Sequence, residues 1–238
     1  MEFPVSIWPI IVLAFIHFFG SRLTFISGIP RSIWLSAAGG ASVAYIFLHL
    51  FPELSEGQEE IEELQVLGYI QHHIYLISLI GLAVFYGLER AVISSKGSDK
   101  SEELETGVFW VHIGSFAFYN ALIGYILYHR EEGPVQEMLL FSIAMALHFI
   151  INDYGLQEHH KAYYRRYGRW LLVTALLAGW VAGLILPLPD AVVMMLMAFI
   201  GGAVILNVLK EELPEERKSR YWAFVLGAGV YSALLLFL

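Results

Sequence analysis

Residues 39–53 read GGASVAYIFLHLFPE, and residues 201–215 read GGAVILNVLKEELPE. Each segment begins with Gly-Gly-Ala and ends with Pro-Glu at the same separation. Small residues such as these glycines let helix backbones approach closely in a membrane. What the repeated pattern implies for the fold depends on whether both segments cross a membrane, and in which direction.

The composition indicates an integral membrane protein. Of the 238 residues, 58% are hydrophobic and only 15% are charged, where soluble domains carry about 25% charged residues. The mean hydropathy is +0.63. These values exclude a disordered chain, a nucleic-acid-binding protein and an ordinary soluble enzyme. The sequence contains no cysteine, which excludes disulfides, thiolate metal sites and cysteine nucleophiles.

Long apolar runs fill the chain. A membrane-spanning helix needs about 20 apolar residues, and eight runs approach this length: roughly 5–26, 31–51, 69–88, 107–129, 138–158, 169–187, 189–209 and 220–238. Prolines lie near the ends of runs, and the fourth and fifth contain none, so we expect these two to be unbroken helices. The runs lack the alternation of a membrane β-barrel. We therefore predict an all-α protein, a single polytopic transmembrane domain over residues 1–238.

The basic residues predict the orientation. Thirteen of the 14 Lys and Arg residues fall between spans 1 and 2, 3 and 4, 5 and 6, or 7 and 8, and only Arg130 does not. Basic loops stay on the cytoplasmic side, so both termini are expected outside a plasma or inner membrane. Residues 39–53 then run outward and residues 201–215 inward. This opposition indicates inverted repeats, spans 1–3 and 6–8 around a central pair of spans 4 and 5, an architecture typical of secondary transporters.

Two predicted loops have distinctive compositions. The outer loop 52–68 holds six glutamates and no basic residue. It is either a solvated, helix-like cap or an acidic funnel that concentrates cations. The inner loop 94–106, SSKGSDKSEELET, is polar and is predicted to be a flexible cytoplasmic segment.

Spans 4 and 5 carry the polar residues of greatest interest: Asn120, His148, Asn152 and Asp153. Polar groups inside a span are costly and usually face a cavity or a partner. Imidazole suits zinc and similar metals, whereas amide and carboxylate oxygens suit harder ions. The four residues are therefore a candidate metal site near mid-depth. Alternatively they make hydrogen bonds between helices, and Asp153 pairs with Lys161 or an arginine near the inner interface.

Further histidines suggest two accessory sites. His49, Glu53, His72 and His73 could form an outer capture site, and solvated histidines at the interface are the alternative. His159 lies seven residues after Asn152 and is a candidate inner exit, within a basic, aromatic stretch that could instead anchor a helix end. His17 and His129 are interpreted as structural.

The chain resembles the ZIP (Zrt/Irt-like) metal-ion transporter family. Gly40–Glu53, ending HLFPE, is similar to the second span of that family, and Gly202–Glu215, with ELPE, to its seventh. The family's fourth-span pattern His-Asn-x-x-Glu-Gly retains only Asn120 and Gly124 here. In the fifth span His148 matches, and Asn152, or Asp153 after a one-residue shift, stands where glutamate is expected. The resemblance implies eight spans, outside termini, inverted repeats and a metal site with fewer carboxylates.

The leading functional hypothesis is a ZIP-like permease for zinc or a similar divalent cation, which would be a transported substrate and not a resident cofactor. A permease or sensor with a changed or lost metal substrate is the alternative, using a neutral pocket of Asn120, Asn152, Tyr119 and His148. An intramembrane metal-dependent hydrolase, which needs about three ligands and a bound water, and a bis-histidine haem protein rank lower. No catalytic residue is expected. The expected partners are the bilayer and the ion, a homodimer is left open, and no nucleic acid is expected.

Overall fold

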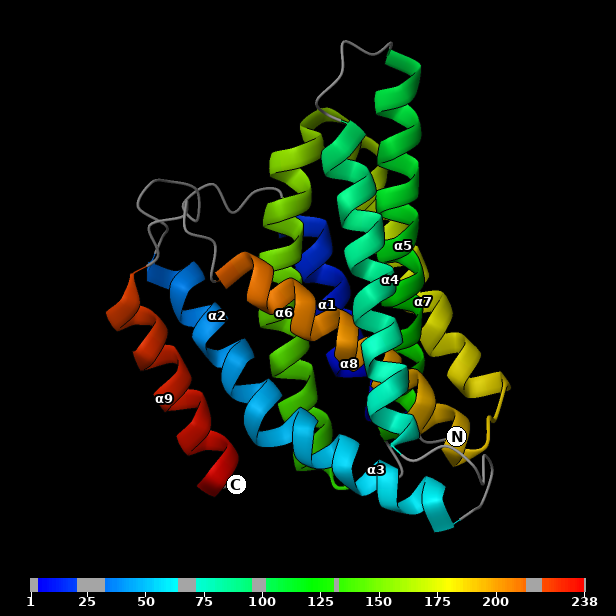
Figure 1. The fold of residues 1–238 in the computed structure, drawn as a ribbon, viewed down its shortest axis with the longest axis vertical. Helices are drawn as coiled ribbons and strands as arrows, with labels where there is room; N and C mark the ends of the chain where they lie inside the picture. Colours follow the sequence, from blue (N-terminus) through cyan, green and yellow to red (C-terminus); the bar gives the residue numbers. More distant parts are fainter. Residues whose placement is uncertain are drawn as a thin grey trace.

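The computed structural model describes residues 4–20, 33–63, 72–95, 102–130, 133–212 and 220–237, and all regular structure within these ranges is helical. Figure 1 shows the arrangement of the helices. The α-helices are α1 Ile7–Gly20, α2 Ile33–Tyr45, α3 Phe51–Glu63, α4 His73–Ser95, α5 Glu102–His129, α6 Val135–Tyr163, α7 Arg169–Ile185, α8 Asp190–Glu212 and α9 Tyr221–Phe237. Two π-helical segments, η2 Ile46–Leu50 and η4 Tyr164–Gly168, join α2 to α3 and α6 to α7. The predicted all-α fold is confirmed.

The described helices identify a multi-pass membrane protein. Six are long and apolar enough to cross a bilayer: Ile33–Glu59, His73–Ala91, Phe109–His129, Val135–Gln157, Tyr164–Ile185 and Asp190–Lys210. Two shorter apolar helices, Ile7–Phe19 and Tyr221–Phe237, lie where the first and last spans are predicted. Large apolar side chains remain exposed on these helices, as expected for surfaces that face lipid.

The second span continues beyond the membrane-length segment as one helical run. At η2 the N–H of Phe51 bonds the carbonyl of Ile46, five residues back. A proline inside a helix lacks an N–H and clashes with the carbonyl four residues earlier, and a π-helical turn loosens this spacing. The turn therefore lets Pro52 continue the helix into α3. Residues 52–63 of the predicted outer loop are helical, and residues 64–68 lie outside the described part of the chain.

Helices α5 and α6 are the longest in the described structure, at 28 and 29 residues, and both are unbroken as predicted. Their main neighbours are different, however: α5 packs along α7, and α6 packs against α1 and α2. The two helices approach each other where the ring centroids of Tyr119 and His148 lie 5.7 Å apart. Within the predicted loop 94–106, α4 extends through Ser95 and α5 begins at Glu102.

Three helix pairs cross at reciprocal glycines: α2 with α9, α4 with α8, and α5 with α7. A Cβ on Gly40 would collide with the carbonyl oxygen of Phe224, and one on Gly227 with that of Ala37. The same pairwise contact recurs between Gly202 and Ser78, Gly81 and Phe199, Gly124 and Leu176, and Gly179 and Ala121. Because the obstructing atoms are backbone, a larger residue would push the helices apart.

The first two crossings correspond position by position. Gly40 and Gly202 are each the second glycine of the repeated Gly-Gly-Ala. The separation between Gly40 and Gly202 in the sequence equals that between their neighbours Ala37 and Phe199. On the partner helices, Phe224 of α9 follows Ser78 of α4 by the same number of residues as Gly227 follows Gly81. In Figure 1, α9 lies along α2 at one edge of the molecule, whereas α8 and α4 lie further inside.

Candidate functional site

A buried polar cluster joins three helices at His17 of α1. The Nδ1 of His17 lies 2.9 and 3.0 Å from the two carboxylate oxygens of Asp153 on α6. Its Nε2 lies 2.7 Å from the amide oxygen of Asn120 on α5. The exposed fractions of His17, Asn120 and Asp153 are 1%, 1% and 0%. A carboxylate is therefore held inside an apolar bundle, where charged groups need a partner.

The hydrogen bonds define the donors in this cluster. The amide nitrogen of Asn120 donates to the carbonyl of Phe116 at 2.8 Å, which turns the amide oxygen toward His17. Both ring nitrogens of His17 thus face acceptors, and both are satisfied when each carries a proton. The ring of Phe149 covers that of His17, with centroids 4.2 Å apart.

A second polar pair lies beside the first on α6. The amide nitrogen of Asn152 donates to Nε2 of His148 at 2.9 Å, one helical turn away. The Nδ1 of His148 and the hydroxyl of Tyr119 are both buried and find no hydrogen-bond partner among the described residues. A buried group without a partner costs about 1–3 kcal/mol. The centroids of the two rings lie 5.7 Å apart between α5 and α6, so a species bound between these helices could gain hydrogen bonds to both groups.

The structure thus divides the four predicted site residues into two sets. Asn120 and Asp153 meet through His17, whereas His148 and Asn152 bond to each other. Asp153 pairs with His17, and the side chain of Lys161, the alternative partner predicted for it, lies outside the described part of the structure. Within the described part of the chain, no group of three or more His, Asp or Glu side chains is arranged to hold a metal ion.

His17 is the residue that sequence reasoning missed. The sequence interpretation of His17 as structural does not anticipate that it makes the hydrogen bonds that bring Asn120 and Asp153 into one cluster. One signal was available, since it is an ionisable residue within the apolar run IWPIIVLAFIHFFG. Such a residue inside a span usually faces a partner on another helix.

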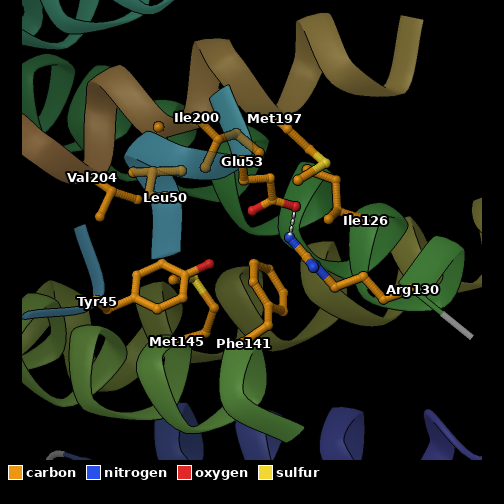
Figure 2. Close-up of a pocket in the computed structure, with 11 residues that line it drawn as sticks. Tyr45, Leu50, Glu53, Ile126, Arg130, Phe141, Met145, Met197, Ile200 and Val204 are labelled. Carbon is orange, nitrogen blue, oxygen red and sulfur yellow. Dashed lines mark hydrogen bonds and ion pairs between the residues drawn. The ribbon is translucent and has the colours of Figure 1, made fainter. Parts of the chain in front are cut away.

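A cavity lies between η2, α3, α5, α6 and α8 and holds an ion pair; we call it the outer cavity after the orientation that the basic residues predict. The guanidinium of Arg130 donates to the carboxylate of Glu53, and the two groups point toward each other in Figure 2. The cavity has a volume of about 20 Å³, enough for about one water molecule. Burial disfavours the charged form of Arg130, but the charge and hydrogen bond of Glu53, together with Tyr45 and Glu137, favour it, so the pKa of Arg130 is raised above its usual value.

A larger cavity of about 190 Å³ adjoins the first, because Glu53 and Met197 line both. Glu56 and Met194 also line it. Residues of α8 line both cavities, Glu56 of the acidic helix α3 lines the larger one, and Tyr45 and Met145 border the smaller one. This arrangement places the two carboxylates beside a hollow, as the acidic-funnel interpretation of the outer loop requires.

The predicted outer capture residues fall into two groups: His49 and Glu53 lie one turn apart on one helical run and interact electrostatically, whereas His72 and His73 lie at the start of α4. Glu53 is engaged by Arg130, and His49 packs its ring 5.2 Å from that of Tyr45. His72 is exposed with a φ of 65°, and His73 is buried at the start of α4. The N–H of Ile74 donates to the side-chain oxygen of Gln58 at 2.9 Å, which fastens the start of α4 to α3.

A second buried carboxylate lies near the other end of α4. Glu89 accepts from Lys210 of α8 at 2.7 Å and lies 3.4 Å from Nε2 of His112 on α5. This triad ties three helices together at the end that the basic residues predict to be cytoplasmic. The candidate exit residue His159 lies in α6, and its side chain is outside the described part of the structure.

Comparisons with known proteins add no relative. A scan against protein-family models and a search of curated proteins both found no match to this chain. The resemblance to the ZIP family therefore rests on the quoted sequence segments alone.

Proposed function

We propose that this protein is a ZIP-like permease that moves zinc or a similar divalent cation across a plasma or inner membrane. The observation that supports the proposal is the buried cluster of His17, Asn120 and Asp153. It combines imidazole nitrogen, amide oxygen and one carboxylate, the donor types that bind divalent metals. Asp153 supplies the negative charge that a dehydrated cation needs in a medium of low dielectric constant.

The cluster is occupied by its own hydrogen bonds when no ion is bound. Metal ligands must be deprotonated, so an arriving cation would replace the proton on His17. His148 offers the nearby buried nitrogen that lacks a partner among the described residues. With a single carboxylate in the cluster, binding should be weaker than at a carboxylate-bridged site. Weak binding suits a site that must also release its ion.

The glycine crossings support the inverted repeat that we propose for this permease. The repeat would relate span 1 to span 6, span 2 to span 7, span 3 to span 8 and span 4 to span 5. In helix labels, α2 then corresponds to α8 and α9 to α4, so the α2·α9 crossing corresponds to the α8·α4 crossing. In the same way the α5·α7 contact corresponds to the α6·α1 contact, and both contacts are present. In such folds the substrate site lies near mid-depth between the repeats. The basic residues support outside termini.

Zinc uptake into liposomes is the test. Purified wild-type protein should load zinc above empty vesicles, and Asp153→Asn should abolish uptake because the only carboxylate of the cluster is lost. Asp190→Asn, which alters an exposed carboxylate, is the matched control and should retain uptake. Equal uptake by wild type and Asp153→Asn would contradict the proposed site, and no uptake by wild type would contradict the proposed function.

One observation favours a second candidate, a permease or sensor of the same fold with a neutral substrate. Tyr119 and His148 present a hydroxyl and a ring nitrogen without partners among the described residues, and these groups recognise a polar solute through hydrogen bonds. Zinc calorimetry separates the two candidates. Heat of binding in wild type that is lost in His148→Ala supports the metal, whereas a folded wild type without zinc binding favours the neutral substrate.

A further inference from the structure

Arg130 departs from the charge pattern of the whole chain. It is the one basic residue that falls outside the four predicted cytoplasmic loops, so it does not serve the orientation that the other 13 set. Its side chain is only 10% exposed. A residue that is buried, charged and in the unexpected loop requires an explanation at its own site.

The contacts of the Arg130 side chain explain why it is buried there. The guanidinium bonds Glu53 and lies 4.6 Å from the centroid of the Phe141 ring, a distance suited to a cation–π contact. The second carboxylate oxygen of Glu53 is buried and has no partner among the described residues. Figure 2 shows the two charged groups in the middle of the cavity, with Phe141 and Met145 on one side and Ile200 on the other.

We propose that Arg130 is a tethered cation that occupies Glu53 and thereby sets which ions can pass the outer cavity. An incoming ion must displace the guanidinium from the carboxylate. A monovalent ion brings the same charge without the hydrogen bonds and ring contact of Arg130, whereas a divalent ion brings twice the Coulomb attraction at a given distance. Arg130 is therefore a specificity-determining residue that favours divalent cations. This role rests on the proposed cation transport.

The cavity charge can be measured without transport. Because the chain has no cysteine, Met197→Cys introduces a single thiol at a residue that lines both outer cavities. The readout is the ratio of its labelling rates with a cationic and an anionic methanethiosulfonate reagent. Removing Arg130 leaves Glu53 unpaired, so Arg130→Gln should raise this ratio about tenfold, as for other electrostatically steered encounters. Arg130→Lys should leave it within about twofold.

Two further variants keep the test decisive. Glu53→Gln removes the carboxylate that is bonded to Arg130, which makes the cavity more positive, and should lower the ratio, the opposite sign from Arg130→Gln. Arg166→Gln, a change at an exposed arginine in η4 that lies over Tyr167, is the matched control and should leave it unchanged. Opposite shifts in the two cavity variants support the proposal. An unchanged ratio in either correctly folded cavity variant overturns it.

Ion selectivity completes the test in liposomes. Arg130→Gln should raise sodium uptake relative to zinc uptake about tenfold, and Arg130→Lys should retain the wild-type selectivity. An unaltered selectivity in Arg130→Gln overturns the specificity role. The two measurements distinguish failure of the proposed transport from failure of the Arg130 role. Wild-type protein that moves no zinc contradicts the proposed function, even where the labelling ratio supports the neutralisation of Glu53 by Arg130.

Discussion

Among the described residues, two histidine–aspartate pairs lie in opposite surroundings. His17 and Asp153 are 1% and 0% exposed in their side chains and lie 2.9 Å apart between α1 and α6. His129 and Asp190 are 20% and 76% exposed and lie 3.4 Å apart between α5 and the start of α8. The same two side-chain types are therefore found in apolar and in aqueous surroundings within one molecule.

Burial changes how much a pair of opposite charges contributes to stability. An exposed pair is screened by water and contributes about 0–1 kcal/mol. A buried pair carries a large desolvation cost, and removing one partner leaves an uncompensated charge. Asp153 therefore depends on His17, or on a cation in its place, in a way that Asp190 does not depend on His129. This dependence is the physical basis of the proposed cation site.

Stability should show the largest difference between the pairs. Asp153→Asn removes the buried carboxylate that faces the His17 ring and, if the two form a buried ion pair, should lower the free energy of unfolding by about 3–5 kcal/mol. Asp190→Asn should lower it by less than about 1 kcal/mol. Reversible unfolding in detergent micelles measures both. Similar losses in the two variants would show that Asp153 is not held as a charge in the folded protein.

Metal binding should separate the two histidines next. His17→Ala should weaken zinc binding at least about 10–100-fold, the range found even for residues one shell further from a metal. His129→Ala removes a histidine of the exposed pair and should leave the affinity unchanged. Calorimetric titration of both variants and wild type makes the comparison. An equal loss of zinc affinity in His129→Ala would indicate that zinc binds at the exposed pair and not at the buried cluster.

A smaller change in stability is expected at the buried hydroxyl of Tyr119. The hydroxyl of Tyr119 is buried without a partner among the described residues, so Tyr119→Phe should stabilise the ion-free protein by about 1 kcal/mol. The exposed ring of Tyr86 offers a control, and Tyr86→Phe should have almost no effect. Destabilisation by Tyr119→Phe would indicate that the hydroxyl does have a partner in the membrane.

Salt should produce the smallest effect and should act on one pair only. Raising the ionic strength from about 0.1 to 1 M shortens the screening length from about 10 to 3 Å. The small stability difference between wild type and Asp190→Asn should then disappear. The difference between wild type and Asp153→Asn should persist, because the buried pair is not in contact with solvent ions. Unfolding experiments at both salt concentrations measure the contrast.

Local features of the sequence predicted the helices well. The proline-free runs around Asn120 and His148 form the two longest helices of the described structure, because apolar composition and helix propensity are local properties. The repeated Gly-Gly-Ala predicted a close helix approach, and Gly40 and Gly202 each lie against the backbone of another helix. The partner helices themselves, α9 and α4, could not be read from these segments.

The composition of the candidate site was only partly predictable. Asn120 and Asp153 stand out as polar residues within apolar runs, but their common partner comes from α1, more than 100 residues away. Such pairing is set by tertiary packing and leaves no periodic signal in one sequence. The continuation of the helix through Pro52 was also unforeseen, because it depends on the π-helical turn before it.

Locating zinc directly is the most decisive measurement for the proposed site. Anomalous diffraction from zinc-loaded crystals, recorded at the zinc edge, would place the ion among the described side chains. We expect a peak about 2.0–2.2 Å from an oxygen of Asp153 and from an imidazole nitrogen of His17 or His148. A peak only beside Glu53, Glu89 or the exposed Asp190, or a cluster that stays hydrogen-bonded and free of zinc, would contradict it.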